Sequence, residues 1–407
     1  MNGTTRKIVL VALVTAVFAC MVPICQAEPL WHIQLGPLNA IRQAWYTESH
    51  VCYQHSYPKT VVEIIDIETG QHEPPLTDLP DIWPTHVLQD PHVSERVYYV
   101  ATDTLVYDTL LKSPVRTIQQ RMDYRIRPVH YKDNIVFPHG YRSYELISID
   151  KQDNIAWTCR MPGYVMSHPI SMGPLMVAQT RGSSYGGQAT FAVNLIDGTI
   201  LWNDVTNAYG SGAVFSSDDQ RVYVIEANRW MEPGRAQGRI YCRDALNGEI
   251  IWKVCLDRYH VYHRPLIDTE ANLVYILSDS HGDDRSNHEN ALFCFDVPTG
   301  ELMWKANLTK GISRATGGYS YEPYYPIMQL YKSRIILLHE DDSIGVYESH
   351  NGMKLYTLYP ESYLPEAPRK RPDNQHSRFL VPPPILRDKL VLVTRYHIMA
   401  LDAKLYF

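Results

Sequence analysis

The sequence predicts an all-β fold: an eight-bladed β-propeller of four-stranded antiparallel blades, closed by the N-terminal strand. Three observations predict it: a turn motif that recurs along the chain, alternating strands around each copy, and complementary chain ends. The composition agrees, since 29 Tyr and 27 Pro against 8 Phe in 407 residues favour strands and turns over long helices. Beyond the N-terminus there is no apolar run of about 18 residues, so no membrane-spanning helix is predicted there.

The recurring motif has the form Asp-x-x-x-Gly-x-x-x-Trp. Its clearest copies cover residues 194–202, 244–252 and 296–304, and weaker copies cover 150–157 and 348–356. Two earlier copies keep only the turn, and a last copy begins near residue 402. Eight copies at spacings of 42 to 54 residues are typical of a propeller with four strands per unit. The copies begin at Asp66, Asp108, Asp150, Asn194, Asp244, Asp296, Glu348 and Asp402.

Each unit is predicted to contain four strands. The first lies near a proline such as Pro169 or Pro265, the second is an alternating run such as 273–277, and the third is a short run such as 291–295. The Asp and Gly of the motif then form a tight turn, because Asp accepts hydrogen bonds from nearby backbone amides and Gly tolerates positive φ. A fourth strand that carries the Trp follows the turn.

The two chain ends complement each other. The last unit stops after its third strand, at residues 402–407, and the segment 30–35 is similar to the fourth strands at 252–256 and 304–308. We therefore expect the N-terminal strand to complete the eighth blade, because this leaves no open sheet edge between the first and last units. The sequence thus predicts a single domain over residues 28–407.

Residues 1–27 have the pattern of a secretory signal peptide. A basic pair, Arg6 and Lys7, precedes an apolar stretch at 8–17, and small residues at the end predict cleavage after Ala27. The alternatives are an uncleaved anchor and lipidation at Cys20. The sequence therefore predicts an exported protein, periplasmic or extracellular. Loss of the two basic residues changes the formal charge from −6 to −8, which excludes a basic nucleic-acid binder.

Five of the seven cysteines lie beyond the signal peptide. None are adjacent and none form a Cys-x-x-Cys pair, so neither a disulfide scaffold nor structural zinc is predicted. A bridge between Cys242 and Cys255 is one alternative, and apolar filling of the core is the favoured role for all five. They are Cys52, Cys159, Cys242, Cys255 and Cys294.

The turn motif resembles the tryptophan-docking repeat of propellers of the pyrroloquinoline-quinone (PQQ) type. That family includes the quinoprotein alcohol dehydrogenases and the propeller lipoprotein of the outer-membrane β-barrel assembly machinery. The resemblance covers residues 28–407 and implies that the repeat tryptophans pack between blades. Members that bind PQQ hold it against an adjacent cysteine pair, which this sequence lacks, so no cofactor is expected. The structural repeat residues are Trp31, Trp157, Trp202, Trp252 and Trp304.

Polar residues gather where successive inner strands are predicted to begin. A proline holds the preceding residue in extended geometry, which directs similar positions of different blades toward one central funnel. Arg, His and Tyr around such a funnel would concentrate anions on an otherwise acidic protein. The alternative is that they only hydrogen-bond to loop carbonyls. The candidate ligand-binding residues are Arg125, Arg127, His130, His168, His263, Arg264, Tyr324 and Tyr325.

The loop at residues 280–290 contains the best donors for a cation, which are Asp283, Asp284 and His288. Their spacing matches no regular metal-binding motif, so a solvated polar loop is favoured and no metal is predicted.

These observations favour a non-enzymatic binding or scaffold protein, monomeric, with a protein, an anionic small molecule or a glycan as its partner. No Gly-x-Ser-x-Gly elbow occurs, which removes a common hydrolase signal. The alternative is an enzyme that uses the same funnel, either a lyase for acidic glycans or a divergent quinoprotein dehydrogenase.

Overall fold

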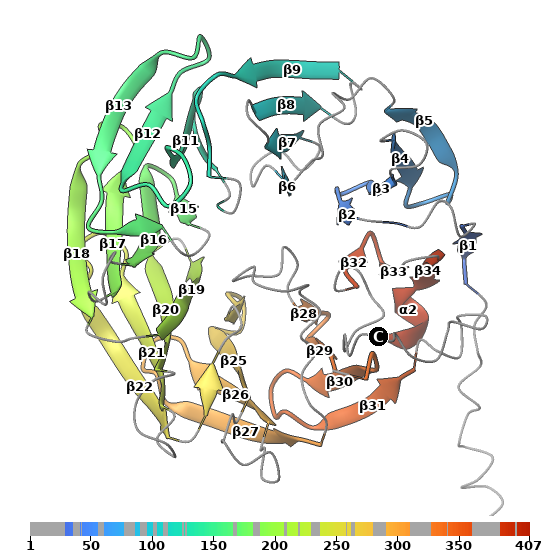
Figure 1. Cartoon of the computed structure of the whole chain (residues 1–407). Helices are drawn as coiled ribbons and strands as arrows, with labels where there is room; N and C mark the ends of the chain where they lie inside the picture. Colours follow the sequence, from blue (N-terminus) through green and yellow to red (C-terminus); the bar gives the residue numbers. More distant parts are fainter. Residues whose placement is uncertain are drawn as a thin grey trace, which may run out of the picture.

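The computed structural model describes residues 29–35, 41, 43–55, 61–76, 86–89, 96–100, 104–108, 113–123, 126, 128–165, 169–181, 188–206, 210–218, 220–228, 237–257, 259–261, 265–279, 290–309, 327–339, 341–359, 383–394 and 397–407. These residues form eight antiparallel sheets and a short helix. Figure 1 shows the sheets following one another in chain order around a ring. The prediction of an all-β chain of repeated antiparallel sheets is confirmed.

We number the sheets 1 to 8 in chain order. Sheet 1 contains β2 (Gln43–Tyr46), β3 (His50–His55), β4 (Val61–Asp66) and β5 (His72–Leu76). Sheet 2 contains β6 (His86–Gln89), β7 (Arg96–Val100), β8 (Thr104–Asp108) and β9 (Ser113–Ile118). Sheet 3 contains β10 (Val129–Tyr131), β11 (Asn134–Pro138), β12 (Glu145–Ile149) and β13 (Ile155–Arg160). Sheet 4 contains β14 (Tyr164–Val165), β15 (Ile170–Met172), β16 (Leu175–Arg181), β17 (Gln188–Asn194) and β18 (Ile200–Thr206).

The second half of the chain continues this pattern. Sheet 5 contains β19 (Gly210–Asp218), β20 (Arg221–Asn228), β21 (Gln237–Asp244) and β22 (Ile250–Asp257). Sheet 6 contains β23 (His260–Val261), β24 (Leu266–Asp268), β25 (Leu273–Asp279), β26 (Asn290–Asp296) and β27 (Leu302–Leu308). Sheet 7 contains β28 (Met328–Tyr331), β29 (Arg334–Leu338), β30 (Ile344–Glu348) and β31 (Lys354–Leu358). Sheet 8 contains β32 (Ile385–Leu386), β33 (Lys389–Val393), β34 (His397–Asp402) and β1 (Trp31–Gln34).

The first strand is divided in sheets 4 and 6. β14 and β15 both pair with β16, and β23 and β24 both pair with β25. Pro169 directly precedes β15, and Pro265 directly precedes β24. Because proline has no N–H to donate to the ladder, a proline in this position separates the two halves of the strand.

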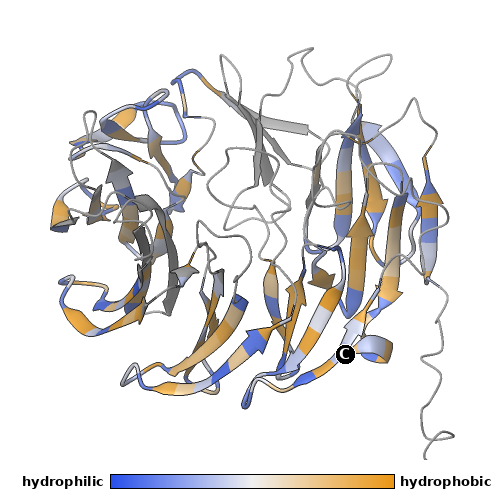
Figure 2. Ribbon diagram, turned by 60° about the horizontal axis from the view of Figure 1, so that its bottom comes forward, coloured by the Kyte–Doolittle hydropathy of each residue, from blue (hydrophilic) through white to orange (hydrophobic). Residues whose placement is uncertain are grey.

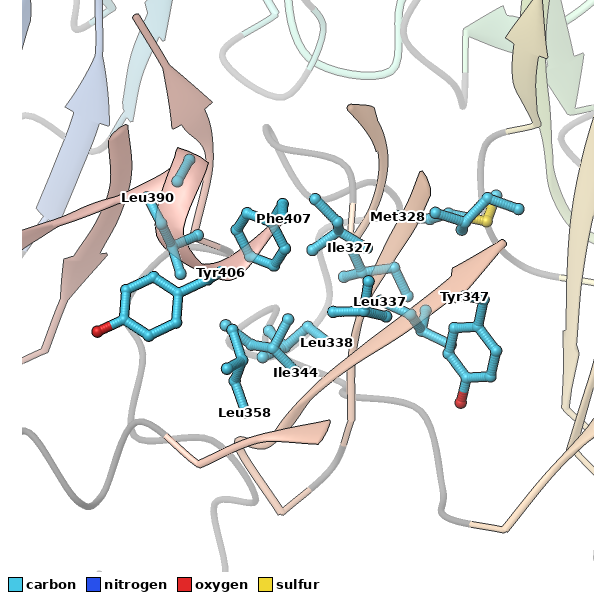
Figure 3. Close-up of a cluster of buried hydrophobic side chains, with 14 of the residues drawn as sticks. Ile327, Met328, Leu337, Leu338, Ile344, Tyr347, Leu358, Leu390, Tyr406 and Phe407 are labelled. Carbon is cyan, nitrogen blue, oxygen red and sulfur yellow. The ribbon is translucent and has the colours of Figure 1, made fainter. Parts of the chain in front are cut away.

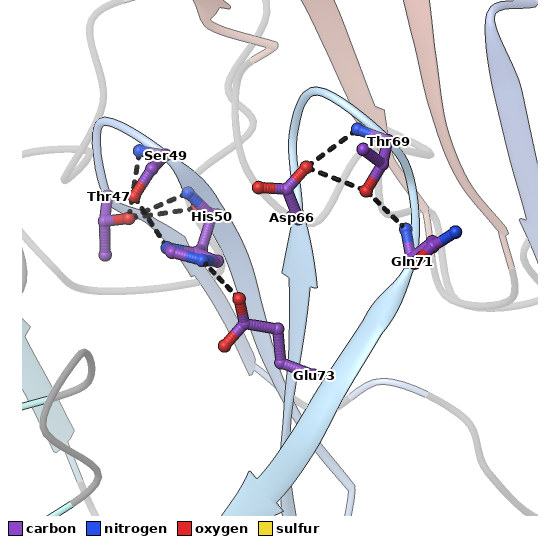
Figure 4. Close-up of polar contacts among 7 residues, drawn as sticks. All are labelled: Thr47, Ser49, His50, Asp66, Thr69, Gln71 and Glu73. Carbon is purple, nitrogen blue, oxygen red and sulfur yellow. Dashed lines mark hydrogen bonds and ion pairs between the residues drawn. The ribbon is translucent and has the colours of Figure 1, made fainter.

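The eight motif anchors each end the third strand of a sheet or directly follow it. In sheet 1 the Asp66 carboxylate accepts hydrogen bonds from the Thr69 backbone N–H (2.7 Å) and from the Thr69 hydroxyl (2.8 Å), as Figure 4 shows. Burial acts to raise the pKa of Asp66, but the hydrogen bonds from Thr69 outweigh it and the pKa lies below its ordinary value. The anchor therefore fixes the turn as an ionised hydrogen-bond acceptor.

Each of the five repeat tryptophans connects its own sheet to the next one. Each indole Nε1–H donates to the backbone carbonyl of the residue that follows an anchor in the neighbouring sheet. The indole also covers the motif glycine: a Cβ on Gly300, which has φ +72°, would lie 2.6 Å from Trp252. Trp252 is buried, whereas the other four are partly buried. The bonds are Trp31 to Ile67 (2.9 Å), Trp157 to Leu195 (3.2 Å), Trp202 to Ala245 (2.9 Å), Trp252 to Val297 (2.7 Å) and Trp304 to Ser349 (3.1 Å).

Sheet 8 combines the two ends of the described chain. β1 pairs antiparallel with β34, with Trp31 opposite Ala400 and Gln34 opposite His397. Trp31 reaches Ile67 in sheet 1, and Lys389 of β33 forms an ion pair with Glu68 of the sheet 1 turn. Sheet 8 is therefore joined to sheet 1 by the same tryptophan contact that joins other neighbouring sheets.

Apolar side chains fill the space between the sheets. Strands such as β26, β33 and β34 are buried along most of their length, as expected when both faces of a sheet are covered. Figure 2 shows the hydrophobic colour running along the strands. A large cluster joins sheets 6, 7 and 8 and includes Leu337, Ile344 and Leu390 (Figure 3).

The chain ends in a helical turn. After β34, residues 403–406 form α2 (Ala403–Tyr406), whose N-cap Asp402 accepts a hydrogen bond from the Lys404 N–H at 2.9 Å. Phe407 is buried against the same cluster, and Arg334 of sheet 7 donates to its backbone oxygen at 2.5 Å. In the described part of the chain, no helix is long and apolar enough to cross a membrane.

Candidate binding surface

Antiparallel strands reverse direction, so the connections of each sheet lie on two opposite faces. The anchor turns and the hairpins between first and second strands share one face, which we call the turn face. Loops between second and third strands share the other face with the connections between sheets, and we call it the loop face. Substantial described parts of the loop face are the loop at 139–144 in sheet 3 and residues 339 and 341–343 of the loop in sheet 7.

Most of the funnel residues predicted from the sequence lie outside the described residues. These are Arg125, Arg127, His168, His263, Arg264, Tyr324 and Tyr325. His130 is described: it is partly buried on β10, opposite Ile135. The funnel therefore stays a prediction.

The predicted cation ligands and the predicted signal peptide also lie outside the described residues. These are Asp283, Asp284, His288 and the segment 1–27 with Cys20. Within the described ranges, no group of three or more His, Cys, Asp or Glu residues could hold a metal ion.

The cysteines correct one prediction. All five are free, and four are buried, but Cys255 is exposed on β22, so it does not fill the core. Cys242 lies opposite Trp252, while Cys255 lies opposite Arg239, so the two thiols do not face each other across the ladder. Burial, with the nearby Asp268 and Asp296, raises the pKa of Cys294 to about 12, which makes this thiol unreactive.

The loop of sheet 3 presents a cation close to two aromatic rings. The guanidinium of Arg142 lies 5.1 Å from the ring centre of Tyr141 and 5.7 Å from that of Tyr164. Tyr164 packs edge to face on Tyr144, with ring centres 6.3 Å apart. Arg142 is exposed, and Tyr141 is 45% exposed. The loop therefore holds an arginine in a fixed aromatic setting at the surface.

Two further arginines flank this loop. A Cβ on Gly140 would lie 3.9 Å from Cδ of Arg121, and Arg160 lies opposite Glu145 where the loop enters β12. Both arginines are exposed. We call this group the Arg–Tyr patch; it consists of Arg121, Tyr141, Arg142, Tyr144, Arg160 and Tyr164.

Two hydrogen bonds donated by backbone N–H groups hold the loop at residues 139–144 in place. Arg142 has φ 53°, in the left-handed region, and its backbone N–H donates to the carboxylate of Asp123 at 3.2 Å. Asp123 is 1% exposed, so this contact is sheltered from water. The N–H of His139 closes the loop on the carbonyl of Glu145 at 2.9 Å. A non-glycine residue in this conformation stores strain that the surrounding contacts must offset, which is common at functional sites.

The charges of the patch are poorly compensated. The Glu145 carboxylate faces Nδ1 of His139 at 3.2 Å and forms no ion pair with its cross-strand neighbour Arg160. No described residue forms an ion pair with Arg121, Arg142 or Arg160. Three guanidinium groups therefore remain open to a partner on a chain whose formal charge is −6.

Sequence reasoning missed the Arg–Tyr patch. The funnel argument followed the prolines, and the loop at 139–144 contains none. The available signal was the run Tyr141-Arg142-Ser143-Tyr144 beside Gly140, between two strands of one unit. Loops of this kind carry function more often than the strands they join.

Comparisons with known proteins place the chain in a family. The family model described as outer membrane protein assembly factor BamB matches residues 122–282 and 236–404. No curated protein sequence matches the chain. Among solved structures, BamB from Moraxella catarrhalis is 14% identical over 76% of this chain and 81% of its own, with a TM-score of 0.50.

Two other structures are similar in fold. The computationally designed Ika8 protein is 12% identical and covers 92% of this chain and 99% of its own, with a TM-score of 0.56. The quinohemoprotein alcohol dehydrogenase from Comamonas testosteroni is 11% identical, covers 83% of this chain and 70% of its own, and has a TM-score of 0.54. The repeat, the fold and the family match agree: the chain is a β-propeller and belongs to the PQQ-like repeat family described as outer membrane protein assembly factor BamB.

Proposed function

We propose that this protein is a non-enzymatic binding or scaffold protein that holds a protein partner against the Arg–Tyr patch. The observation that carries the proposal is the exposed guanidinium of Arg142, 5.1 Å from the ring centre of Tyr141 in the same loop and 5.7 Å from that of Tyr164 on β14. Tyr and Arg are enriched among residues that dominate binding energy in protein interfaces. The family supports a binding role as well, because it is described as an assembly factor for outer membrane proteins.

The scaffold that carries this patch is, in our proposal, one ring of eight blades over residues 28–407, closed by β1. The pairing of β1 with β34 and the contact of Trp31 with sheet 1 support closure. Deletion of residues 28–36 would then expose the edge of β34 and remove Trp31 from the joint. We expect a large loss of cooperative stability and aggregation, measured by thermal unfolding and light scattering. Unfolding that matches the full chain would contradict a closed ring.

The proposal also places the protein outside the cytoplasm and gives it no bound quinone. The signal-like segment 1–27 supports export, and the lack of adjacent cysteines supports the second point. An absorbance scan and metal analysis of the purified protein test the second point directly, since a stoichiometric quinone would make an enzyme the better interpretation.

Binding at the patch is tested with a photo-crosslinking residue at position 141 in the full chain. A matched crosslinker at Lys132, on the turn-face hairpin of the same sheet, is the control. We expect a discrete protein product from position 141 alone. The partner, once purified, should bind the Tyr141→Ala variant at least about tenfold more weakly than wild type, as expected for an interface residue that contributes strongly. Equal binding would refute a partner at this surface.

A further inference from the structure

We infer that the segment bound at the Arg–Tyr patch is an acidic peptide, whose carboxylates pair with Arg142 first and with Arg121 and Arg160 beside it. This inference rests on the proposed function, since it names the chemistry of the partner at the same surface.

Arg142 has the geometry of a carboxylate receptor. Its guanidinium carbon lies 5.1 Å from the ring centre of Tyr141 and 5.7 Å from that of Tyr164. The guanidinium N–H groups make no hydrogen bond or ion pair with the described residues. A guanidinium whose N–H groups have no other acceptor presents two parallel donors, which match the two oxygens of a carboxylate.

The receptor is also held in place before the partner arrives. The Arg142 backbone has a left-handed φ of 53° and donates its N–H to the buried Asp123 at 3.2 Å, and its guanidinium lies against two tyrosine rings. A side chain that is already ordered loses less entropy on binding, so more of the interaction energy appears as affinity.

Because the three arginines of the patch have no ion pair among the described residues, we expect the bound segment to be negatively charged. Two acidic residues contact the loop: the Asp123 carboxylate accepts from the Arg142 backbone N–H at 3.2 Å, and the Glu145 carboxylate lies 3.2 Å from Nδ1 of His139. The three arginines come from three separate segments, 121, 142 and 160, and none has an ion pair among the described residues. A segment that carries several carboxylates satisfies all three, whereas a basic segment meets like charges.

The same arrangement favours a peptide over a small anion. Tyr141 is 45% exposed and its ring lies beside the Arg142 guanidinium, so the patch includes exposed aromatic surface that an inorganic anion does not use. A polypeptide covers both the ring and the arginines, and it can place carboxylates at each of the three positions.

The test is selection of a displayed random peptide library on the full-length protein, with counter-selection on Tyr141→Ala. Peptides whose capture requires Tyr141 define binders of the patch. We expect them to be rich in Asp and Glu and to be lost on Arg142→Gln. The Lys132→Gln variant is a matched control, because Lys132 has φ 56°, stacks on the preceding Tyr131 at 5.2 Å and lies at the opposite end of sheet 3.

The outcomes separate the two proposals. A neutral or basic consensus that needs Tyr141 but not Arg142 overturns the acidic peptide and leaves the partner-binding function standing. Failure of any peptide to depend on Tyr141, together with no crosslinked product, overturns both.

The affinities of acidic peptides for wild type and variants test the role of Arg142 quantitatively. For the best acidic peptide, fluorescence anisotropy should show binding weakened roughly 10- to 100-fold by Arg142→Gln and unchanged by Lys132→Gln. The Arg142→Lys variant should recover only part of the affinity, because an ammonium cannot form the bidentate pair. Replacement of the peptide's Asp and Glu by Asn and Gln should abolish the effect of Arg142, and competition by sulfate as strong as by peptide would instead assign a small-anion site.

Discussion

The turn face and the loop face differ in how far the sequence repeats. On the turn face, each of five tryptophans donates to the carbonyl of the residue after an anchor, so the same joint recurs from sheet to sheet. On the loop face, the loops at 139–144 and 339–343 differ in length and in the three residues between their first histidine and their shared serine. Repetition therefore marks the part of the molecule that holds it together, and departures from it mark where a specific role can be found.

The two described loops show how far this difference goes. Both begin with a histidine, both close on its N–H, and both contain a left-handed residue, Arg142 in one and Asp342 in the other. In sheet 7 the loop turns inward: His339 is 0% exposed and Asp342 is 5% exposed. In sheet 3 the longer loop turns outward and presents Tyr141 and Arg142. The same backbone conformation thus occurs in a packed loop of one sheet and in an exposed loop of the other.

The largest effect is expected at a turn-face joint. Replacement of Trp252 by Ala removes an indole that is 8% exposed and breaks its 2.7 Å bond to Val297, so we expect a loss of about 3–5 kcal/mol in the free energy of unfolding. Chemical denaturation measures it. Binding of acidic peptide to the folded fraction should not change. The Trp252→Phe variant, which keeps an aromatic ring, should lose less; equal losses would show that ring packing is not the main contribution.

This contrast also explains what the sequence predicted and what it did not. The repeated motif predicted the turns, the third strands and the strands that pair with the third strands, because eight copies of the motif support one interpretation. It did not predict the division of the first strand in sheets 4 and 6, or the helical turn after Asp402, where single residues decide the local structure. The Arg–Tyr patch was missed for the same reason, because Tyr141 and Arg142 lie outside the repeated motif, in a loop whose sequence varies from unit to unit.

A smaller effect is expected at Gly345 of β30, which packs against His339 of the inward loop of sheet 7. A Cβ on Gly345 would lie 2.4 Å from Nε2 of His339 and 2.7 Å from the Tyr347 ring, in a fully packed region. The Gly345→Ala variant should therefore lose about 1–3 kcal/mol of stability through overpacking. The Ser143→Ala variant in the outward loop is the matched comparison and should stay within about 0.5 kcal/mol of wild type. Similar losses in both denaturation curves would remove the distinction between the loops.

The smallest effect concerns pH and a third loop on the loop face, the one that leads into β34. This loop closes with the Thr394 N–H on the His397 carbonyl at 2.8 Å, and Nδ1 of His397 faces Nε2 of His32 on β1 at 3.1 Å. Burial lowers the pKa of both imidazoles, and the nearby His32 lowers the pKa of His397 further. The ladder places Gln34 and Met399 beside the pair, and neither residue titrates.

The sign of the pH effect follows from these lowered pKa values. As the pH falls below the ordinary histidine pKa of 6.5, the unfolded chain binds protons that the folded pair resists, so stability decreases until the folded pair is protonated as well. Two adjacent imidazolium groups would then repel each other across β1 and β34. We therefore expect the unfolding midpoint to fall between neutral and mildly acidic pH, and to fall less in His32→Gln. His350 is the control, since it is exposed and paired with Glu348 at 3.1 Å on the turn face. If His350→Gln flattens the pH dependence as much as His32→Gln does, the strand pair is not its source, and the loop-face end of β34 has no special part in stability.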